Sequence, residues 1–231
     1  MSGRLDGQVV VVTGAGSGIG LAAARAFARE GARVAVCGRD AKKLEAAKAA
    51  FAQACDVTDA KAVDAFAAAA VKKLGRVDVL INNAGALGPT GPLVDCAPAD
   101  WAATLAANAT GPFLMTRAVL KAARPSCVIG ISSGQGRKGT AGWGPYAASK
   151  YALEGLTSVW ADEYKDKGTR FFTLSPGPTA TAMRAAAAPQ EDPKTIKTPD
   201  AVANALVQIV LDGTIATGTL LRLDPKGALQ C

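Results

Sequence analysis

A tyrosine and a lysine four positions apart, Tyr146 and Lys150, are candidates for proton transfer. Residues i and i+4 lie on one face of a helix, so the phenol and the ammonium would project into the same space. A nearby cation favours the phenolate form of a tyrosine. The chain contains no histidine, which excludes imidazole bases and His-ligated metal sites. Proton chemistry must therefore use Asp, Glu, Lys, Tyr or Cys, although this spacing alone is a weak signal.

A second candidate site is the glycine-rich run Thr-Gly-Ala-Gly-Ser-Gly-Ile-Gly at residues 13–20. It follows an apolar run and opens a helix-like stretch, so its backbone could pass close to a diphosphate at a helix N-terminus. It is not a P-loop, because no Lys-Ser/Thr follows the last glycine, and Ile19 breaks the G-x-G-x-x-G pattern. The run predicts a dinucleotide site; a glycine-rich turn without a ligand is the alternative.

Alternating apolar runs and alanine-rich stretches must position these residues. The apolar runs are 9–12, 34–37, 77–81, 127–131, 171–174 and 220–223, and the helix-like stretches are 19–30, 41–50, 59–74, 98–123, 144–167 and 199–212. Nearly continuous apolar runs are typical of strands covered on both faces. The alternation predicts a single doubly wound α/β domain over residues 1–231, with a parallel sheet of about seven strands and helices on both faces.

Two segments interrupt this alternation. Residues 85–98 are rich in Gly and Pro, and residues 176–199 contain five prolines and directly follow a strand. Ligands bind beyond the carboxyl ends of strands in open α/β sheets, so both segments are expected to line a site. Plain surface loops are the alternative.

Composition removes several other classes of function. The chain of 231 residues is 49% hydrophobic and 19% charged, which is typical of a folded globule. Its five cysteines are widely spaced without a C-x-x-C pair, which predicts a reduced cytoplasmic protein with no disulfide framework and no metal site. No apolar stretch is long enough to predict a membrane span. The net charge of +7 is scattered in basic pairs without aromatic residues, so no nucleic-acid partner is expected.

The sequence resembles the short-chain dehydrogenase/reductase family, which has a Rossmann fold, from residue 7 to about residue 227. Beyond the two motifs above, the resemblance rests on the following residues: Asp56 after a third strand, Asn82-Asn83-Ala84-Gly85 after the fourth, Asn108 in the long fourth helix, Ser133 at 13 residues before Tyr146, and Pro176-Gly177 with Thr181. Residues 138–146, 183–184, 191–193 and 198–199 are similar to the YciK-like oxidoreductases. The strand near the C-terminus lacks the family's common Asp-Gly-Gly ending, which leaves the substrate open.

The resemblance implies a role for each of these residues. Tyr146 would be the general acid in carbonyl reduction and the general base in alcohol oxidation, and Lys150 would lower its pKa. Ser133 would hold the substrate oxygen, and Asn108 would anchor a water molecule; satisfying nearby backbone is the alternative for Asn108. The implied cofactor-binding residues are Gly14, Ser17, Gly18, Ile19, Gly20, Arg39, Asp56, Val57, Asn83, Ala84, Gly85, Tyr146, Lys150, Pro176, Gly177, Thr179 and Thr181. The implied substrate contacts are Ser133, Trp143, Tyr146 and Met183.

The cofactor predicted from the second strand is NADP(H), with NAD(H) as the alternative. An NAD enzyme usually has a carboxylate where this chain has Gly38, followed by Arg39. A guanidinium can bind a 2′-phosphate in a bidentate manner. Asp40 is expected to cap the following helix, and Asp56 could likewise be a helix cap, in competition with Asp59.

The predicted activity is an oxidoreductase that acts on a small-molecule carbonyl or secondary alcohol, without a defined substrate. A catalytically silent dinucleotide sensor is the alternative, but such a sensor typically lacks the tyrosine or lysine that is present here. Self-association as a dimer or tetramer is also expected, because the helices over 98–123 and 144–167 carry surplus apolar residues: Phe113, Met115, Leu153, Leu156 and Trp160.

Overall fold

The computed structural model describes residues 3–231, which fold around one eight-stranded sheet in the order β3-β2-β1-β4-β5-β6-β7-β8. The strands are β1 Val9–Thr13, β2 Arg33–Gly38, β3 Phe51–Ala54, β4 Val79–Asn82, β5 Cys127–Ile131, β6 Arg170–Ser175, β7 Leu220–Leu223 and β8 Leu229–Gln230. The first seven strands pair in parallel, and β8 pairs with β7 in the antiparallel sense. The strand order reverses between β1 and β4, which makes a crevice at their carboxyl ends.

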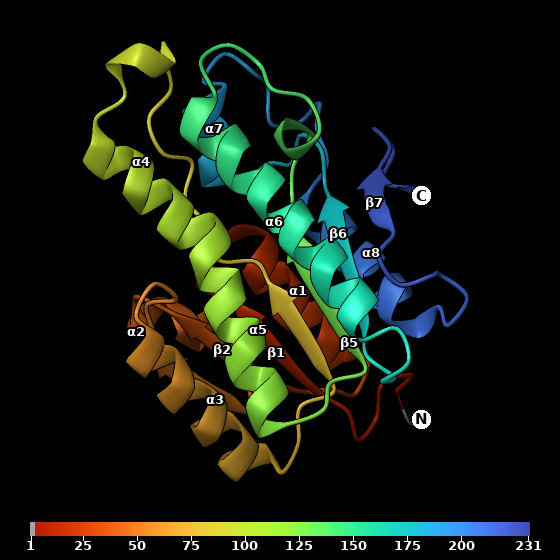
Figure 1. The fold of residues 1–231 in the computed structure, drawn as a ribbon. Helices are drawn as coiled ribbons and strands as arrows, with labels where there is room; N and C mark the ends of the chain where they lie inside the picture. The colour runs from red at the N-terminus through yellow and green to blue at the C-terminus, as the bar shows by residue number, and fades with distance from the viewer. Residues whose placement is uncertain (1–2) are drawn as a thin grey trace.

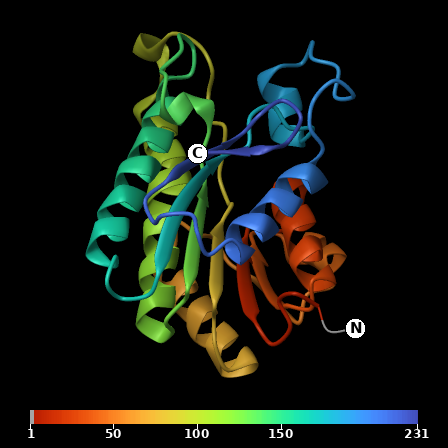
Figure 2. The ribbon, with the colours of Figure 1, turned by 90° about the vertical axis from the view of Figure 1, so that its right-hand side faces the viewer.

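Helices cover both faces of the sheet (Figures 1 and 2). The helices α1 Gly18–Arg29 and α8 Pro199–Leu211 pack on one face, and α3 Ala60–Leu74, α5 Gly111–Ala122 and α6 Gly144–Glu163 pack on the other. Alternate side chains of β1 divide between two buried cores: Val10 and Val12 face the first group, whereas Val9 and Val11 face the second. This burial on both faces explains the continuous apolar runs and confirms the predicted doubly wound Rossmann-type fold.

Several elements differ from the sequence prediction. The helix expected over 41–50 consists of α2 Ala41–Leu44 and the short 3-10 helix η1 Glu45–Ala47, and Lys48 ends it with a left-handed φ of 49°. β3 was not among the apolar runs, because it is an edge strand whose residues alternate between partly buried and exposed. The predicted loop over 176–199 contains a short helix, α7 Ala182–Ala187.

The long helix expected over 98–123 is divided into α4 Pro98–Leu105, the π-helical segment η3 Ala106–Thr110 and α5. The prediction that these helices carry a surplus of apolar surface is also partly wrong. Met115 and Leu153 are buried in the molecule, whereas Phe113 is 40% exposed and stacks on Trp160.

The carboxyl ends of the central strands meet at the upper edge of the sheet in Figure 1, below α4 and the loops that precede α6 and α7. Thr13, the last residue of β1, fixes the reversal point: its Oγ1 accepts hydrogen bonds from the backbone N–H groups of Asn83, at 3.0 Å, and Ala84, at 2.9 Å. Within residues 3–231 there is no helix long and apolar enough to cross a membrane.

Candidate active site

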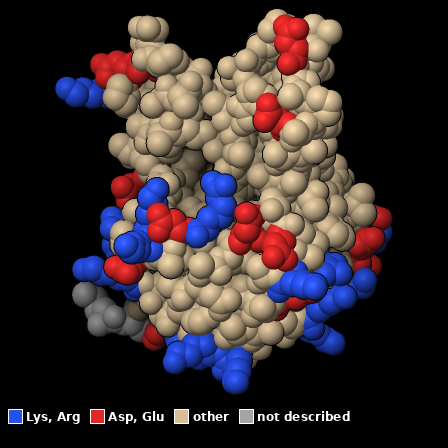
Figure 3. Space-filling model, turned by 90° about the vertical axis from the view of Figure 1, so that its left-hand side faces the viewer, with Lys and Arg blue, Asp and Glu red and all other residues tan. Residues whose placement is uncertain are grey.

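A cleft of about 1010 Å³ lies over the carboxyl ends of the central strands. Figure 3 shows it between two walls of mostly uncharged surface, with lysine and arginine side chains at its lower rim. The lining comes from the turn after each strand, and it contains every predicted catalytic residue, every predicted cofactor residue except Gly20, and the predicted substrate residues. Segments far apart in the sequence thus form one continuous site.

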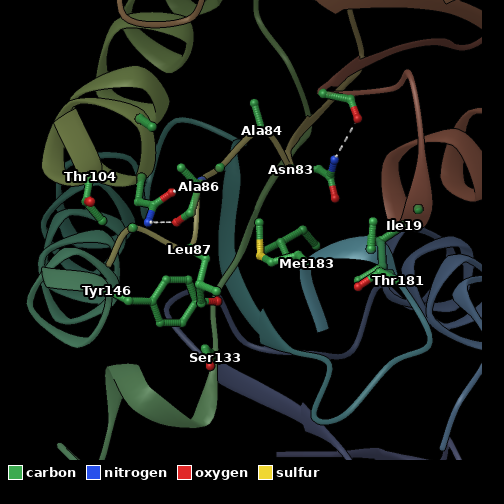
Figure 4. A pocket seen from close by; sticks show the side chains of 18 of the residues that line it. Ile19, Asn83, Ala84, Ala86, Leu87, Thr104, Ser133, Tyr146, Thr181 and Met183 are labelled. Carbon is green, nitrogen blue, oxygen red and sulfur yellow. Dashed lines mark hydrogen bonds between the residues drawn. The ribbon is translucent and has the colours of Figure 1, made fainter. Parts of the chain in front are cut away.

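The glycine-rich turn after β1 is packed too tightly for any other residue at two of its positions. Gly14 has a φ of 66°, and a Cβ there would lie 2.8 Å from the Cα of Ala84. A Cβ on Gly20 would lie 2.5 Å from the carbonyl oxygen of Gly14. Asn83 holds the turn by donating from Nδ2 to the carbonyl oxygens of Thr13, at 2.9 Å, and Gly14, at 3.2 Å (Figure 4). The turn is therefore a rigid cradle at the N-terminus of α1, as a diphosphate requires.

Two basic residues lie at the end of the cleft beside β2. Arg39, the residue after Gly38, lines the cleft. Asp40 caps α2, as expected, by accepting from the N–H of Lys42 at 3.0 Å. Lys43 was missed from the sequence: a Cβ on Gly16 would lie 3.0 Å from its Cβ, so this lysine stands next to the glycine-rich turn. The predicted Asp40 cap was the signal that could have found Lys43, because the cap starts α2, and residues of α2 line the cleft.

Asp56 and Val57 line the same end of the cleft. The Oδ1 of Asp56 accepts from the backbone N–H of Thr58 at 2.9 Å and from its hydroxyl at 2.8 Å. These bonds, helped by the charge of Arg39, lower the pKa of Asp56. The cap of α3 is Asp59, which accepts from the N–H groups of Lys61 and Ala62, so Asp56 does not cap that helix.

At the other end of the cleft, Tyr146 and Lys150 lie one turn apart on α6. The Nζ of Lys150 donates to the carbonyl oxygen of Ile131 at 2.7 Å and lies 5.5 Å from the centre of the Tyr146 ring. Ser133, just beyond β5, is the serine that interacts with the phenol of Tyr146, whereas the hydroxyl of Ser132 points to Glu154. The geometry therefore brings Ser133, rather than its neighbour, to the tyrosine.

The pKa values of this pair differ from the expectation that Lys150 lowers that of Tyr146. Burial raises the pKa of Tyr146, and the interaction with Ser133 only partly opposes this. Burial also lowers the pKa of Lys150 to about 8, against the opposing charge of Glu154. Desolvation disfavours the charged form of both groups, and it is the largest cause of both shifts.

Asn108 lies buried in the π-helical segment η3. Its Oδ1 accepts from the N–H of Ala86 at 2.7 Å, and its Nδ2 donates to the carbonyl oxygen of Ala86 at 2.8 Å and to Ser149 at 2.9 Å. A Cβ on Gly85 would lie 2.7 Å from Oδ1 of Asn108 and 3.8 Å from Nζ of Lys150. Asn108 therefore satisfies local backbone, as the alternative interpretation expected, while it also lies close to the lysine.

The part of the cleft around Tyr146 that was predicted to contact substrate is largely apolar. The ring of Trp143 packs against Tyr146 with centroids 5.8 Å apart, and in Figure 4 Met183 lies in the middle of the pocket, between Tyr146 and Thr181. Leu87, within the segment 85–98 that was expected to line a site, also lines this region, as does Thr104, and neither was predicted individually. Their loop and helix positions carry no motif that could have identified them.

The turn after β6 completes the lining with Pro176, Gly177, Thr179 and Thr181. Thr181 caps α7 by accepting from the N–H of Arg184 at 3.2 Å, and the guanidinium of Arg184 pairs with Glu191 at 2.6 and 2.7 Å. These contacts fix α7, and with it Met183, beside the cleft.

Comparisons with known proteins agree with this arrangement. Residues 8–192 match the sequence profile described as short chain dehydrogenase. The oxidoreductase YciK of Escherichia coli K12 is 35% identical over 209 residues, which cover 84% of this chain and 82% of YciK. A short-chain dehydrogenase of Shigella flexneri 2a complexed with NADP superimposes with a TM-score of 0.90 at 33% identity, covering 96% of this chain and 99% of that one. One of Escherichia coli CFT073 complexed with NADPH gives a TM-score of 0.89 at 32% identity, covering 96% and 98%.

Proposed function

The chain belongs to the short-chain dehydrogenase family of oxidoreductases, and from this membership we propose that it interconverts a carbonyl group and a secondary alcohol with NADP(H) as cofactor. The observation that carries the proposal is the placement of Ser133, Tyr146 and Lys150 at one end of a cleft whose other end is a glycine cradle flanked by cations. When bound, the nicotinamide cofactor supplies or accepts the hydride.

The residues present fit such a cofactor. The cradle at residues 14–20, which side chains at Gly14 and Gly20 would obstruct, would hold the diphosphate at the N-terminus of α1. Other residues would hold the remaining parts of the cofactor. Asp56 and Val57 would contact the adenine, and Asn83, Ala84 and Gly85 would lie along the adenosine side. Tyr146 and Lys150 would bind the nicotinamide ribose, and the carboxamide would be held by Pro176, Gly177, Thr179 and Thr181.

The preference for NADP(H) over NAD(H) rests on charge. Arg39 and Lys43 both line the cleft beside β2, and together they could bind a 2′-phosphate. The nearby carboxylate of Asp40 is engaged by the N-terminus of α2. The NADP and NADPH found in the two structural relatives support the same choice.

In this proposal Tyr146 transfers the proton at the substrate oxygen. Its raised pKa keeps the phenol protonated at neutral pH, ready to donate to the oxygen during carbonyl reduction. The hydroxyl of Ser133 would position that oxygen, and the ammonium of Lys150 would stabilise the phenolate as it forms. Asn108 would keep the loop after β4 in place beside Lys150 and anchor a water molecule there. Trp143 and Met183 would contact the body of the substrate.

A dinucleotide sensor without turnover is the second candidate. It would need the glycine cradle but not the four side chains at the other end of the cleft. Asn108, Ser133, Tyr146 and Lys150 are all present, and all four line the same cleft, which favours the enzyme.

Self-association is proposed from the outer face of α5 and α6. Phe113, Tyr151 and Val159 are 40%, 48% and 55% exposed on these two helices. A symmetric dimer or tetramer would cover the same face on each subunit.

The decisive experiment measures NADPH oxidation against a panel of ketones, quinones and 3-oxoacyl thioesters, first with the wild type and then with Tyr146→Phe. Loss of the proton donor should lower kcat by about 10²–10⁴-fold, while NADPH binding, followed by fluorescence, stays largely intact. Tyr151→Phe, an exposed tyrosine on the same helix, is the matched control. Wild-type turnover in Tyr146→Phe would refute the proposal.

A further inference from the structure

Glu154 is a buried carboxylate that the proposed chemistry leaves unused. It lies on α6, one helical turn beyond Lys150, and is only 7% exposed. Its Oε1 accepts a hydrogen bond from the hydroxyl of Ser132 at 2.7 Å and pairs with Nε of Arg137 at 3.1 Å. A charge in this position needs such partners, because an unpaired buried carboxylate is strongly disfavoured.

The partners of Glu154 connect three parts of the site. Ser132 precedes Ser133 in the turn after β5, and Arg137 follows the 3-10 helix η4 Gly134–Gly136 in the same loop. The Nη2 of Arg137 also donates to the carbonyl oxygen of Leu221 in β7 at 3.0 Å. The carboxylate therefore joins the serine turn to the helix of Tyr146 and Lys150, and Arg137 anchors both to the sheet.

Stability alone does not account for such a pair. Apolar side chains of similar volume often replace a buried ion pair without loss of stability. A carboxylate held close to a buried lysine has an electrostatic effect that apolar packing cannot supply.

We propose that Glu154 is a positioning residue of the active site, which holds the Ser132–Ser133 turn against α6 and keeps Lys150 in its ammonium form. This inference rests on the proposed function, in which Lys150 acts as a cation beside Tyr146. Arg137 has the opposite electrostatic effect, because its own charge offsets that of Glu154.

The groups around Lys150 show that the electrostatic effect of Glu154 on its pKa is not masked by other carboxylates in the described contacts. Its own helix contributes Tyr146 and Glu154 as titratable groups, and the η4 loop contributes Arg137 behind Glu154. The other surroundings are neutral in the described contacts: the carbonyl of Ile131 from β5, and Gly85 and Asn108 from the opposite side. Burial lowers the pKa of Lys150 to about 8, and the carboxylate of Glu154 raises it against that effect.

The test compares the pH dependence of kcat/KM for carbonyl reduction in two charge variants. In Glu154→Gln the loss of activity at alkaline pH should begin about 1 pH unit lower, because Lys150 loses its proton more easily. In Arg137→Gln it should begin at higher pH, because the carboxylate is no longer offset. Opposite shifts are the expected signature, and a merely structural defect would not produce them.

Matched variants complete the design. Glu163→Gln makes the same change at an exposed position on α6 and should leave the profile unchanged. Glu154→Asp keeps the charge on a shorter side chain, so it should retain an alkaline limb close to that of the wild type even if stability falls. Thermal unfolding of each variant identifies losses of activity that come from misfolding.

An alkaline limb that stays in place in Glu154→Gln, or that moves in the same direction in both charge variants, would overturn the inference. The failure of the proposed function is distinguishable from this, because it would appear as full turnover in Tyr146→Phe. An inactive Tyr146→Phe together with an unshifted Glu154→Gln would reject only the role of Glu154.

Discussion

Lys150 is surrounded mainly by neutral groups, and burial lowers its pKa from an ordinary value of 10.5 to about 8. Between these two values the unfolded chain binds more protons than the folded chain does. The free energy of unfolding that this residue contributes therefore rises with pH across that window, and its full penalty is present below pH 8. The burial that would let Lys150 stabilise the phenolate of Tyr146 in the proposed reaction therefore lowers the stability of the fold at neutral pH.

Replacing Lys150 by Met should expose this penalty. The variant no longer titrates, so its free energy of unfolding relative to the wild type should decrease as the pH rises from about 8 to about 10.5, by about 1.4 kcal/mol for each unit of pKa shift. Urea denaturation at several pH values measures it. Lys121→Met, at an exposed lysine on α5, should show no such trend. A difference that is independent of pH would mean that burial does not lower the pKa of Lys150.

Arg39 and Lys43 make a second residue-level prediction, on cofactor choice. Charged hydrogen bonds contribute about 1.5–3 kcal/mol each, so the wild type should prefer NADPH over NADH by about tenfold or more. Arg39→Ala and Lys43→Ala should each raise the KM for NADPH and leave that for NADH nearly unchanged.

Lys42→Ala is the control for this experiment, because Lys42 is adjacent to Lys43 but does not line the cleft. Steady-state kinetics with both cofactors on one carbonyl substrate measures the preference. Equal efficiency with NADH in the wild type would contradict the assignment.

At the scale of elements, the π-helical segment η3 is the irregular part of the site. A π-turn shifts the register of a helix and occurs frequently at functional sites. Here it carries the buried Asn108, whose amide bonds both backbone groups of Ala86 in the loop after β4. One helix irregularity thus holds a cleft loop that has no regular structure of its own.

Asn108→Ala should destabilise the fold measurably, because it leaves the N–H and C=O of Ala86 without their partners. Each buried group that loses its hydrogen bond costs about 1–3 kcal/mol. Thermal and urea unfolding measure the loss, and Asn204→Ala, at an exposed position on α8, is the matched control. Unchanged stability together with lost activity would instead assign Asn108 a purely catalytic role.

For the whole molecule, we predict that the outer face of α5 and α6 mediates self-association. Val159→Glu and Phe113→Glu would place charges on this exposed apolar face and should convert the expected dimer or tetramer to the 23.3 kDa monomer. Sedimentation velocity at micromolar concentration measures the state.

Ala65→Glu, on the exposed side of α3, should leave the assembly intact and controls for added charge. A wild type that sediments only as a monomer would remove the prediction.

The sequence by itself determined the doubly wound sheet and the key residues of the candidate site. Strands covered on both faces must be continuously apolar, and the pair Tyr146 and Lys150 depends only on the helical repeat. The glycine-rich turn was equally readable, because its requirement for glycine is expressed within a few consecutive residues. Such patterns depend only on residues that are close in the sequence, so they can be recognised without the folded structure.

Only the tertiary structure decided what lies across the cleft and how charge is balanced there. Lys43 reaches the glycine-rich turn, and Glu154 reaches Ser132 and Arg137, through contacts between segments that are separate in the chain. Burial also raised the pKa of Tyr146, against the expectation that the nearby Lys150 would lower it. Desolvation depends on every group that excludes water from a site, and those groups come together only when the chain is folded.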